Sequence, residues 1–143
     1  MTQSMRILIV DDEEPIREAL GAWLIKDGYK VNTADSGQTA LACIEKGFFD
    51  LYLVDIKMPG MGGIETLTEI QRKYPLVEVI MLSGHVDVAA AIEGMKQGAF
   101  DYLMKPVEMD QIIAKVTEAV SKKRQHEEKI IQARINEITS RRA

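Results

Sequence analysis

Five short apolar runs alternate along this chain with segments whose apolar residues recur at helical spacing, and this alternation constrains the fold more than any other feature. Strands that alternate with helices are typical of a parallel sheet covered by helices. The runs predict strands at residues 6–10, 30–33, 51–54, 77–81 and 101–104. We therefore expect an α/β fold, a doubly wound five-stranded parallel sheet with helices on both faces.

The segments between the runs predict helices at residues 15–27, 38–46, 63–74 and 87–97, and a fifth from about 108. Pro15 suits the first turn of its helix, and Gly28, Gly47 and Gly98 suit positions just after a helix end. Residues 122–129 are almost wholly polar, and the apolar residues that follow recur at helical spacing without proline or glycine. We expect an extended C-terminal helix, and we divide the chain into a domain at 5–121 and a charged helical tail or linker at 122–143.

Charge is distributed unevenly between these two parts. Residues 1–121 contain 11 Lys and Arg against 19 Asp and Glu, whereas residues 122–143 contain 7 against 3. The acidic body repels nucleic acid, and the basic tail is more simply explained as a solvated helix surface, so direct nucleic-acid binding is not expected. The apolar runs are too short to cross a bilayer, and the N-terminus does not resemble a signal peptide. We expect no membrane association and a cytoplasmic protein.

Chemically distinctive residues occur where the predicted strands end. Asp11 and Asp12 follow the first run, Asp55 the third, Ser83 the fourth and Lys105 the fifth. The carboxyl ends of parallel strands line one crevice, so these side chains are expected to converge. Three carboxylates, a hydroxyl and an ammonium group together indicate a divalent-metal site beside an anion site.

Electrostatics supports the metal interpretation. At an effective dielectric constant near 20, two carboxylates about 4 Å apart repel each other by roughly 4 kcal/mol. A hard cation relieves this repulsion, and Mg²⁺ typically binds one or two carboxylates together with carbonyl oxygens, waters and phosphate. Glu13 and Glu14 have a simpler explanation, since acidic residues are favourable at a helix start. The long stem of Lys105 can reach Asp55 or a phosphate on it.

Four sequence blocks resemble the receiver domain of bacterial two-component response regulators, most closely the receivers of the nitrogen-regulatory type. The resemblance covers about residues 5–121 and rests on the motifs at 10–13 (VDDE), 55–60 (DIKMPG), 83–85 (SGH) and 98–106 (GAFDYLMKP). It implies a flavodoxin-like sheet of strand order 2-1-3-4-5. It also implies that Asp55 accepts a phosphoryl group from a sensor histidine kinase and that Mg²⁺ is the cofactor.

The resemblance assigns roles to individual residues. Asp12 is expected to contact the metal directly and Asp11 mostly through water, with Asp55 and the backbone carbonyl of Lys57 as further ligands. Nothing needed for phosphorylation is missing from these motifs.

Three further roles concern the phosphorylated state. Lys105 is expected to pair with the phosphate, and Ser83 and Tyr102 to act as a switch pair. The face formed by the helix at 87–97, the last strand and the last helix is then expected to change, and it could support a homodimer together with the tail. The signal would pass to an output domain or a downstream protein, with transcription as a possible target of regulation.

Three alternatives to a phosphoacceptor domain fit the sequence less well. A Mg²⁺-dependent phosphatase with an aspartyl-phosphate intermediate also combines Asp, Ser and Lys, but its best-known type places an Asp-x-Asp motif on the first strand, where this chain has adjacent Asp11 and Asp12. A plain interaction module with a degenerate acidic pocket is disfavoured by the complete set of five strand-end residues. DNA binding through the tail is disfavoured because its seven basic residues are diluted by three acidic ones.

Overall fold

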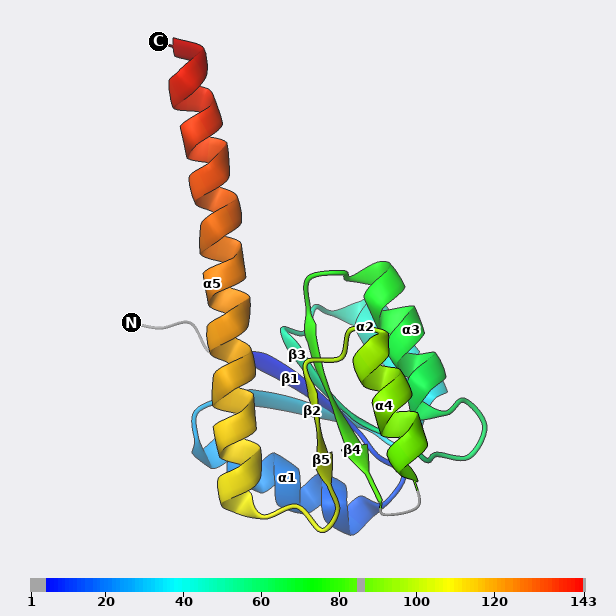
Figure 1. The fold of residues 1–143 in the computed structure, drawn as a ribbon. Helices are drawn as coiled ribbons and strands as arrows, with labels where there is room; N and C mark the ends of the chain where they lie inside the picture. Colours follow the sequence, from blue (N-terminus) through cyan, green and yellow to red (C-terminus); the bar gives the residue numbers. More distant parts are fainter. Residues whose placement is uncertain (1–4, 85–86, 143) are drawn as a thin grey trace.

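The structure is a computed structural model that describes residues 5–84 and 87–142, the last without its side chain. Five parallel strands form one sheet of order β2-β1-β3-β4-β5 (Figure 1). Their bounds are β1 Arg6–Val10, β2 Lys30–Ala34, β3 Leu51–Asp55, β4 Glu78–Ser83 and β5 Asp101–Met104. The predicted doubly wound, flavodoxin-like sheet is confirmed.

Five helices connect and extend these strands. They are α1 Glu14–Lys26, α2 Gly37–Lys46, α3 Gly63–Lys73, α4 Val88–Lys96 and α5 Met109–Arg142. Pro15 lies in the first turn of α1, where its missing N–H costs no hydrogen bond. Gly28 and Gly98, which follow α1 and α4, have φ values of 99° and 107°, a backbone conformation that glycine adopts without strain.

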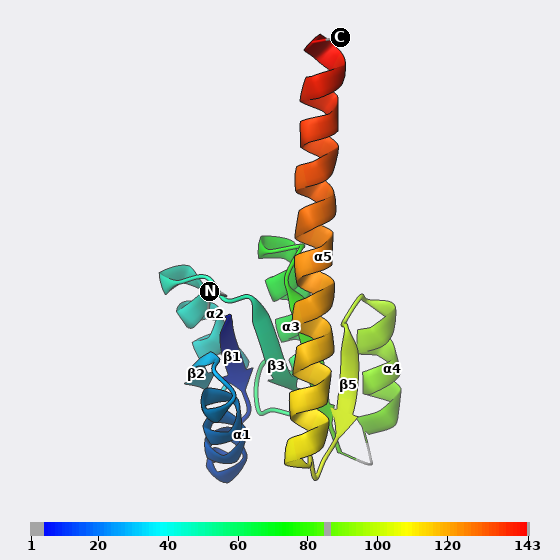
Figure 2. The same ribbon diagram turned by 90° about the vertical axis from the view of Figure 1, so that its left-hand side faces the viewer.

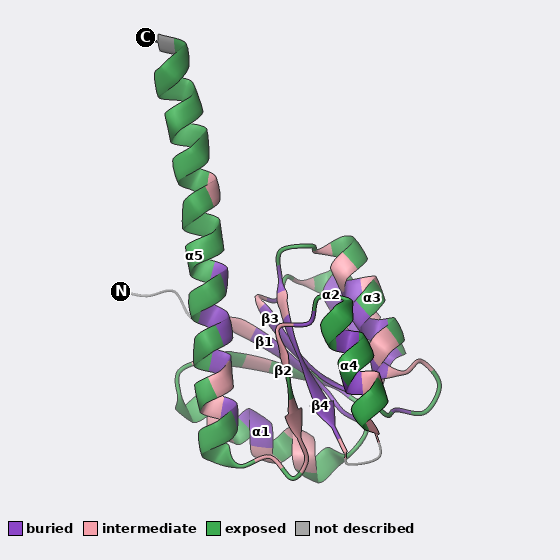
Figure 3. Ribbon diagram, viewed as in Figure 1, coloured by how far each residue is buried: buried purple, intermediate pink, exposed green. Residues whose placement is uncertain are grey.

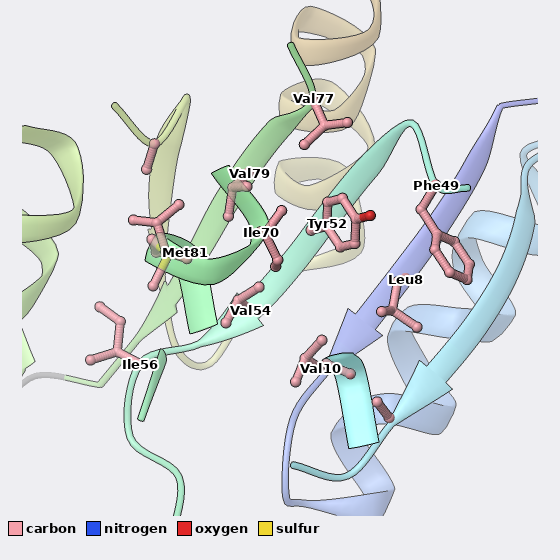
Figure 4. Packing of buried hydrophobic residues seen from close by; sticks show 14 of the residues in the cluster. Leu8, Val10, Phe49, Tyr52, Val54, Ile56, Ile70, Val77, Val79 and Met81 are labelled. Atoms are coloured by element: carbon pink, nitrogen blue, oxygen red, sulfur yellow. The ribbon is translucent and has the colours of Figure 1, made fainter. Parts of the chain in front are cut away.

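Each face of the sheet has its own hydrophobic core, because side chains alternate between the two faces of a strand. On one face, strand residues such as Leu8 and Val79 pack with Ile70 of α3 and with α2 and α4 (Figure 4). On the other face, Leu53 and its neighbours pack against α1 and α5. Each fully buried leucine or isoleucine contributes about 1.5–3 kcal/mol relative to an exposed one. Both faces are thus covered, which leaves the strand ends for polar groups.

The predicted boundaries differ most from the structure at β4. This strand was predicted at 77–81, but it begins at Glu78 and continues to Ser83. The backbone N–H of Val77 donates to Tyr74 O in the preceding turn, while Ser83 pairs with Met104 of β5. Neighbouring strands therefore extend the sheet as far as the polar residues at its edge. His85 and Ala143, included in the predictions, lie outside the described residues.

The extended C-terminal helix is confirmed, since α5 runs without a break from the sheet into the tail (Figures 1 and 2). Most of the tail is exposed (Figure 3), including Ile131, Ile135 and Ile138. Within the described ranges, no helix is both long and apolar enough to cross a membrane.

Candidate functional site

The strand-end residues predicted from the sequence do meet at one edge of the sheet. Asp11 directly follows β1, Asp55 and Ser83 are the last residues of β3 and β4, and Lys105 directly follows β5. The backbone N–H of Asp11 donates to Ala34 O (3.1 Å) and that of Lys105 to Ser83 O (2.7 Å), so the ladder of hydrogen bonds continues past the strand ends. These bonds fix the backbone from which the polar side chains project.

Lys105 contacts three carboxylates from two segments of the chain. Its Nζ lies 2.9 Å from Asp11 Oδ2, 3.3 Å from Asp55 Oδ1 and 3.5 Å from Glu13 Oε1. Asp11 is fully buried and Asp55 is 3% exposed. Both carboxylates are shielded from bulk water. Their attraction to Lys105 is therefore less screened than that of a surface ion pair.

The negative charge at this edge exceeds the positive charge of Lys105. Asp11, Asp12, Glu13 and Asp55 each offer a carboxylate oxygen, and these four oxygens lie within 4.8 Å of one another. Asp11 Oδ2 is buried and accepts no hydrogen bond of good geometry from the described residues, although Lys105 lies close to it. Such a cluster of hard oxygen atoms fits a divalent cation of the Mg²⁺ type.

The sequence interpretation missed the position of Glu13, which it treated only as an acidic residue at a helix start. Glu13 is the N-cap residue of α1, but its side chain makes no capping hydrogen bond and lies instead in the carboxylate cluster. Its backbone N–H donates to Asp11 Oδ1 (2.9 Å), which folds the chain tightly after β1. The unbroken acidic run from Asp11 at a strand end is the signal that could have revealed this position.

Burial and charge shift the proton affinities of the central pair. Burial and the nearby charge of Asp11 raise the pKa of Asp55 from 3.8 to about 7, despite the opposing influence of Lys105. Burial by itself would lower the pKa of Lys105, but its contacts with Asp11 and Asp55 outweigh burial, and the pKa is raised. The ionised form of Asp55 is thus destabilised in the folded protein, and a nearby cation would stabilise it. Lys105 stays charged.

A cavity of about 470 Å³ opens above this group. It is lined by Asp12, Glu13, Asp55, Lys57, Met58, Pro59, Gly84, Asp87 and Lys105. The backbone N–H of Lys57 donates to Asp55 Oδ1 at 3.4 Å. Gly63 lets the start of α3 pack directly on the backbone of Asp55, where a Cβ would clash. The loop after β3 therefore holds Asp55 at the floor of an open cavity.

The predicted switch residues have contrasting surroundings. Ser83 is fully buried, and its hydroxyl donates to the carbonyl of Gly84 at 3.0 Å. Tyr102 lies on β5 opposite Met81 of β4, and its side chain is 37% exposed. The structure thus brings Asp11, Asp12, Asp55 and Lys105 together, with Lys57 lining the same cavity. Ser83 ends the neighbouring strand, where its carbonyl accepts a hydrogen bond from the backbone N–H of Lys105, and Tyr102 lies on the outer surface.

The sequence model of the response regulator receiver domain matches residues 7–117. The chain belongs to this family. The receiver is 38% identical over 115 residues to the DNA-binding transcriptional regulator NtrC of Salmonella typhimurium. This alignment covers 80% of the chain and 24% of NtrC, so the chain spans about a quarter of the length of that relative.

Solved structures agree with the family assignment. A response regulator receiver domain protein from Clostridium thermocellum superimposes with a TM-score of 0.81 at 36% identity, covering 85% of this chain and 98% of that one. NtrX from Brucella abortus superimposes with a TM-score of 0.84 at 31% identity, covering 88% of this chain and 29% of that one. The chain is thus a receiver domain of two-component systems, similar to NtrC-type regulators, and the receiver family is a signalling family.

Proposed function

We propose that this receiver accepts a phosphoryl group on Asp55 from a sensor histidine kinase in a Mg²⁺-dependent reaction. The observation that carries the proposal is the contact of Lys105 Nζ with both Asp11 and Asp55 at the floor of an open cavity. In the transfer, an Asp55 oxygen attacks phosphorus while the bond from phosphorus to the kinase histidine nitrogen breaks. We place this exchange in the cytoplasm.

Mg²⁺ would be held by Asp12, Asp55 and the backbone carbonyl of Lys57, with Asp11 acting mostly through water. The excess of carboxylates and the buried Oδ2 of Asp11 support this ligand set. When bound, the ion supplies positive charge that offsets repulsion between the phosphoryl oxygens and the carboxylates. Lys105 adds a second positive charge beside Asp55, and in this way the chain assists its own phosphorylation and dephosphorylation.

Phosphorylation adds about 1.5 to 2 negative charges and new acceptor oxygens at Asp55. We propose that the Ser83 hydroxyl then leaves the Gly84 carbonyl and donates to a phosphoryl oxygen, and that Tyr102 turns inward from its exposed position. The face made by α4, β5 and α5 changes as a result. Exposed Ile92 and Met95 on α4 support a role for this face in partner or self-association.

The proposed boundary places the phosphoacceptor domain at 5–121 and a linker at 122–143. The exposed stripe of Ile131, Ile135 and Ile138 supports pairing with the tail of a second chain, together with the changing face. NtrC is named as a DNA-binding transcriptional regulator, and this chain aligns with only 24% of it. We therefore propose that the receiver controls an output domain or a downstream protein, such as a regulator of transcription, without contacting DNA itself.

The phosphatase alternative has no support in the comparisons, since the sequence model that matches the chain is that of the receiver domain. The receiver proposal is tested by incubating the protein with acetyl phosphate and Mg²⁺ and measuring its intact mass. The wild-type chain and a matched Asp27→Asn control, altered at an exposed aspartate, should each gain one phosphoryl group. Asp55→Asn should gain none, and an adduct of equal yield on Asp55→Asn would refute the assignment.

The dimer proposal needs a separate measurement. Sedimentation of residues 1–143 and of residues 1–121, each with and without beryllofluoride as a phosphate mimic, should show the largest dimer fraction for the full chain with the mimic. Monomers in all four samples would refute a dimerising tail.

A further inference from the structure

A second lysine cluster lies at the opposite end of the sheet, where α5 passes from the body into the tail. The inner face of α5 carries Ile112, Val116 and Val120, which are buried against the sheet. One turn later, Lys123 is only 6% exposed, and it is the one buried basic residue in the described part of the chain. A lysine is rarely buried without a partner, so its surroundings call for an explanation.

Lys123 is held by groups from two parts of the chain. Its Nζ lies 3.3 Å from Asp50 Oδ1, donates to Glu127 Oε1 at 2.7 Å, and lies 5.6 Å from the centre of the Phe48 ring. Phe48 and Asp50 belong to the loop before β3, whereas Glu127 is one turn further along α5. The lysine therefore joins the start of the tail to the body.

Asp50 is itself fixed by the sheet. Its Oδ2 accepts a hydrogen bond from the backbone N–H of Arg6, the first residue of β1, at 2.9 Å. One carboxylate thus binds β1 through Oδ2 and α5 through Oδ1. Because the side chain of Lys123 is only 8% exposed, this pair is little screened by water, unlike an ordinary surface ion pair.

Lys122, whose side chain is 60% exposed, makes a second and weaker contact on the adjacent side of the helix. Its Nζ lies 5.3 Å from the centre of the Phe100 ring and 3.9 Å from Glu78 Oε2. Consecutive residues of an α-helix point about 100° apart, since the helix has 3.6 residues per turn. Attachments to the start of β3 by Lys123 and to the start of β4 by Lys122 therefore oppose rotation of the helix about its own axis.

We propose that Lys123 is a positioning residue that fixes the direction in which the helical tail leaves the receiver, so that body and tail move as one unit. Both lysines lie beyond residue 117, where the match to the receiver family ends. It rests on its own contacts and is independent of the role proposed for Asp55. It also holds the Ile131, Ile135 and Ile138 stripe at a constant angle to the body.

Distances between two spin labels test this proposal. Labels are attached to cysteines introduced by Glu18→Cys on α1 and Ala133→Cys in the tail, both at exposed positions, in a Cys43→Ala background. Dilution with unlabelled chain restricts the signal to distances within one molecule. The test variant is Lys123→Met, which keeps an apolar stem but loses the ammonium group, and the matched control is Lys129→Met, at an exposed lysine of the same helix.

Lys123→Met should broaden the distance distribution about twofold, because the tail samples more directions once its attachment is lost. Asp50→Asn should broaden it in the same way, while Lys129→Met should match the wild type and Lys123→Arg should restore the narrow distribution. Unchanged distributions in both Lys123→Met and Asp50→Asn would overturn the proposal. Equal broadening by Lys129→Met would also overturn it, because the direction of the tail would then not depend specifically on Lys123.

Discussion

The two ends of the sheet each hold lysine and carboxylate groups, but their charge balance differs. At the carboxyl end, four carboxylates cluster beside an open cavity, and Lys105 contacts three of them. At the opposite end, Asp50, Glu78 and Glu127 face two lysines, and Asp50 is further satisfied by a backbone N–H. An excess of negative charge beside a cavity favours binding of a cation, whereas the nearly balanced charge of three carboxylates and two lysines holds two elements together. The carboxyl end is therefore a candidate binding site, and the opposite end holds α5 to the body.

The largest effect is expected from removing the lysine that contacts the carboxylate cluster, Lys105. Lys105→Met leaves buried Asp11 and Asp55 without their cation, and it should lower the free energy of unfolding by about 3 kcal/mol at pH 8 without divalent metal. The loss should shrink at pH 5, where Asp55 takes up a proton. Urea denaturation at both pH values measures it, with exposed Lys30→Met as the control. A loss as small as that of Lys30→Met would contradict the proposed charge imbalance.

The second largest effect is expected from Mg²⁺, which should stabilise the protein through the carboxylate cluster and not through the opposite end of the sheet. At a free Mg²⁺ concentration of 100 times Kd, binding to the folded state adds about 2.7 kcal/mol to the free energy of unfolding. Asp12→Ala should remove most of this gain and should itself raise stability without metal, because it relieves repulsion in the cluster. Glu14→Ala, at an exposed position outside the cluster, should retain the gain. Thermal melts with Mg²⁺ and with EDTA give both values, and an equal gain in both variants would refute the ligand set.

The raised pKa of Asp55 predicts a dependence of stability on pH. Since the folded state raises this pKa from 3.8 to about 7, folding favours the protonated form, and the resulting penalty grows between about pH 4 and pH 7 and is complete above pH 7. Without metal, the free energy of unfolding of Asp55→Asn should therefore exceed that of the wild type at pH 8, and the difference should fall towards zero near pH 4. Denaturation curves from pH 4 to 8 test this sign. A difference that grows as the pH falls would show the pKa to be lowered instead.

The opposite end, where charge is more nearly balanced, should show the smallest change in stability. Lys123→Met leaves Asp50 with its hydrogen bond from Arg6, so the free energy of unfolding should fall by only about 1 kcal/mol. The fall should not depend on Mg²⁺, since Asp50 lies far from the carboxylate cluster along β3. Urea denaturation with and without Mg²⁺ measures it. If the loss of stability in Lys123→Met depended on Mg²⁺, the two ends of the sheet would be coupled, which would contradict their separate roles.

The sequence predicted the carboxyl end of the sheet better than the opposite end, for a physical reason. Asp55, Ser83 and Lys105 each follow an apolar run, and the parallel sheet brings such positions together whatever their separation along the chain. Lys123 gives no such signal, because a lysine in a polar stretch of helix is typical of a solvated surface. Its pairing with Asp50 depends on the angle at which α5 crosses the sheet, which side-chain periodicity does not encode.

The central claim is that Asp55 carries the phosphoryl group, and locating the modified residue tests it most directly. The receiver is treated with acetyl phosphate and Mg²⁺, the acyl phosphate is reduced with borohydride to homoserine, and the altered residue is located by tandem mass spectrometry. Homoserine should occur at position 55 alone and should be absent when EDTA replaces Mg²⁺. Homoserine at another aspartate, or equal labelling of position 55 in EDTA, would contradict a Mg²⁺-dependent phosphoacceptor at Asp55.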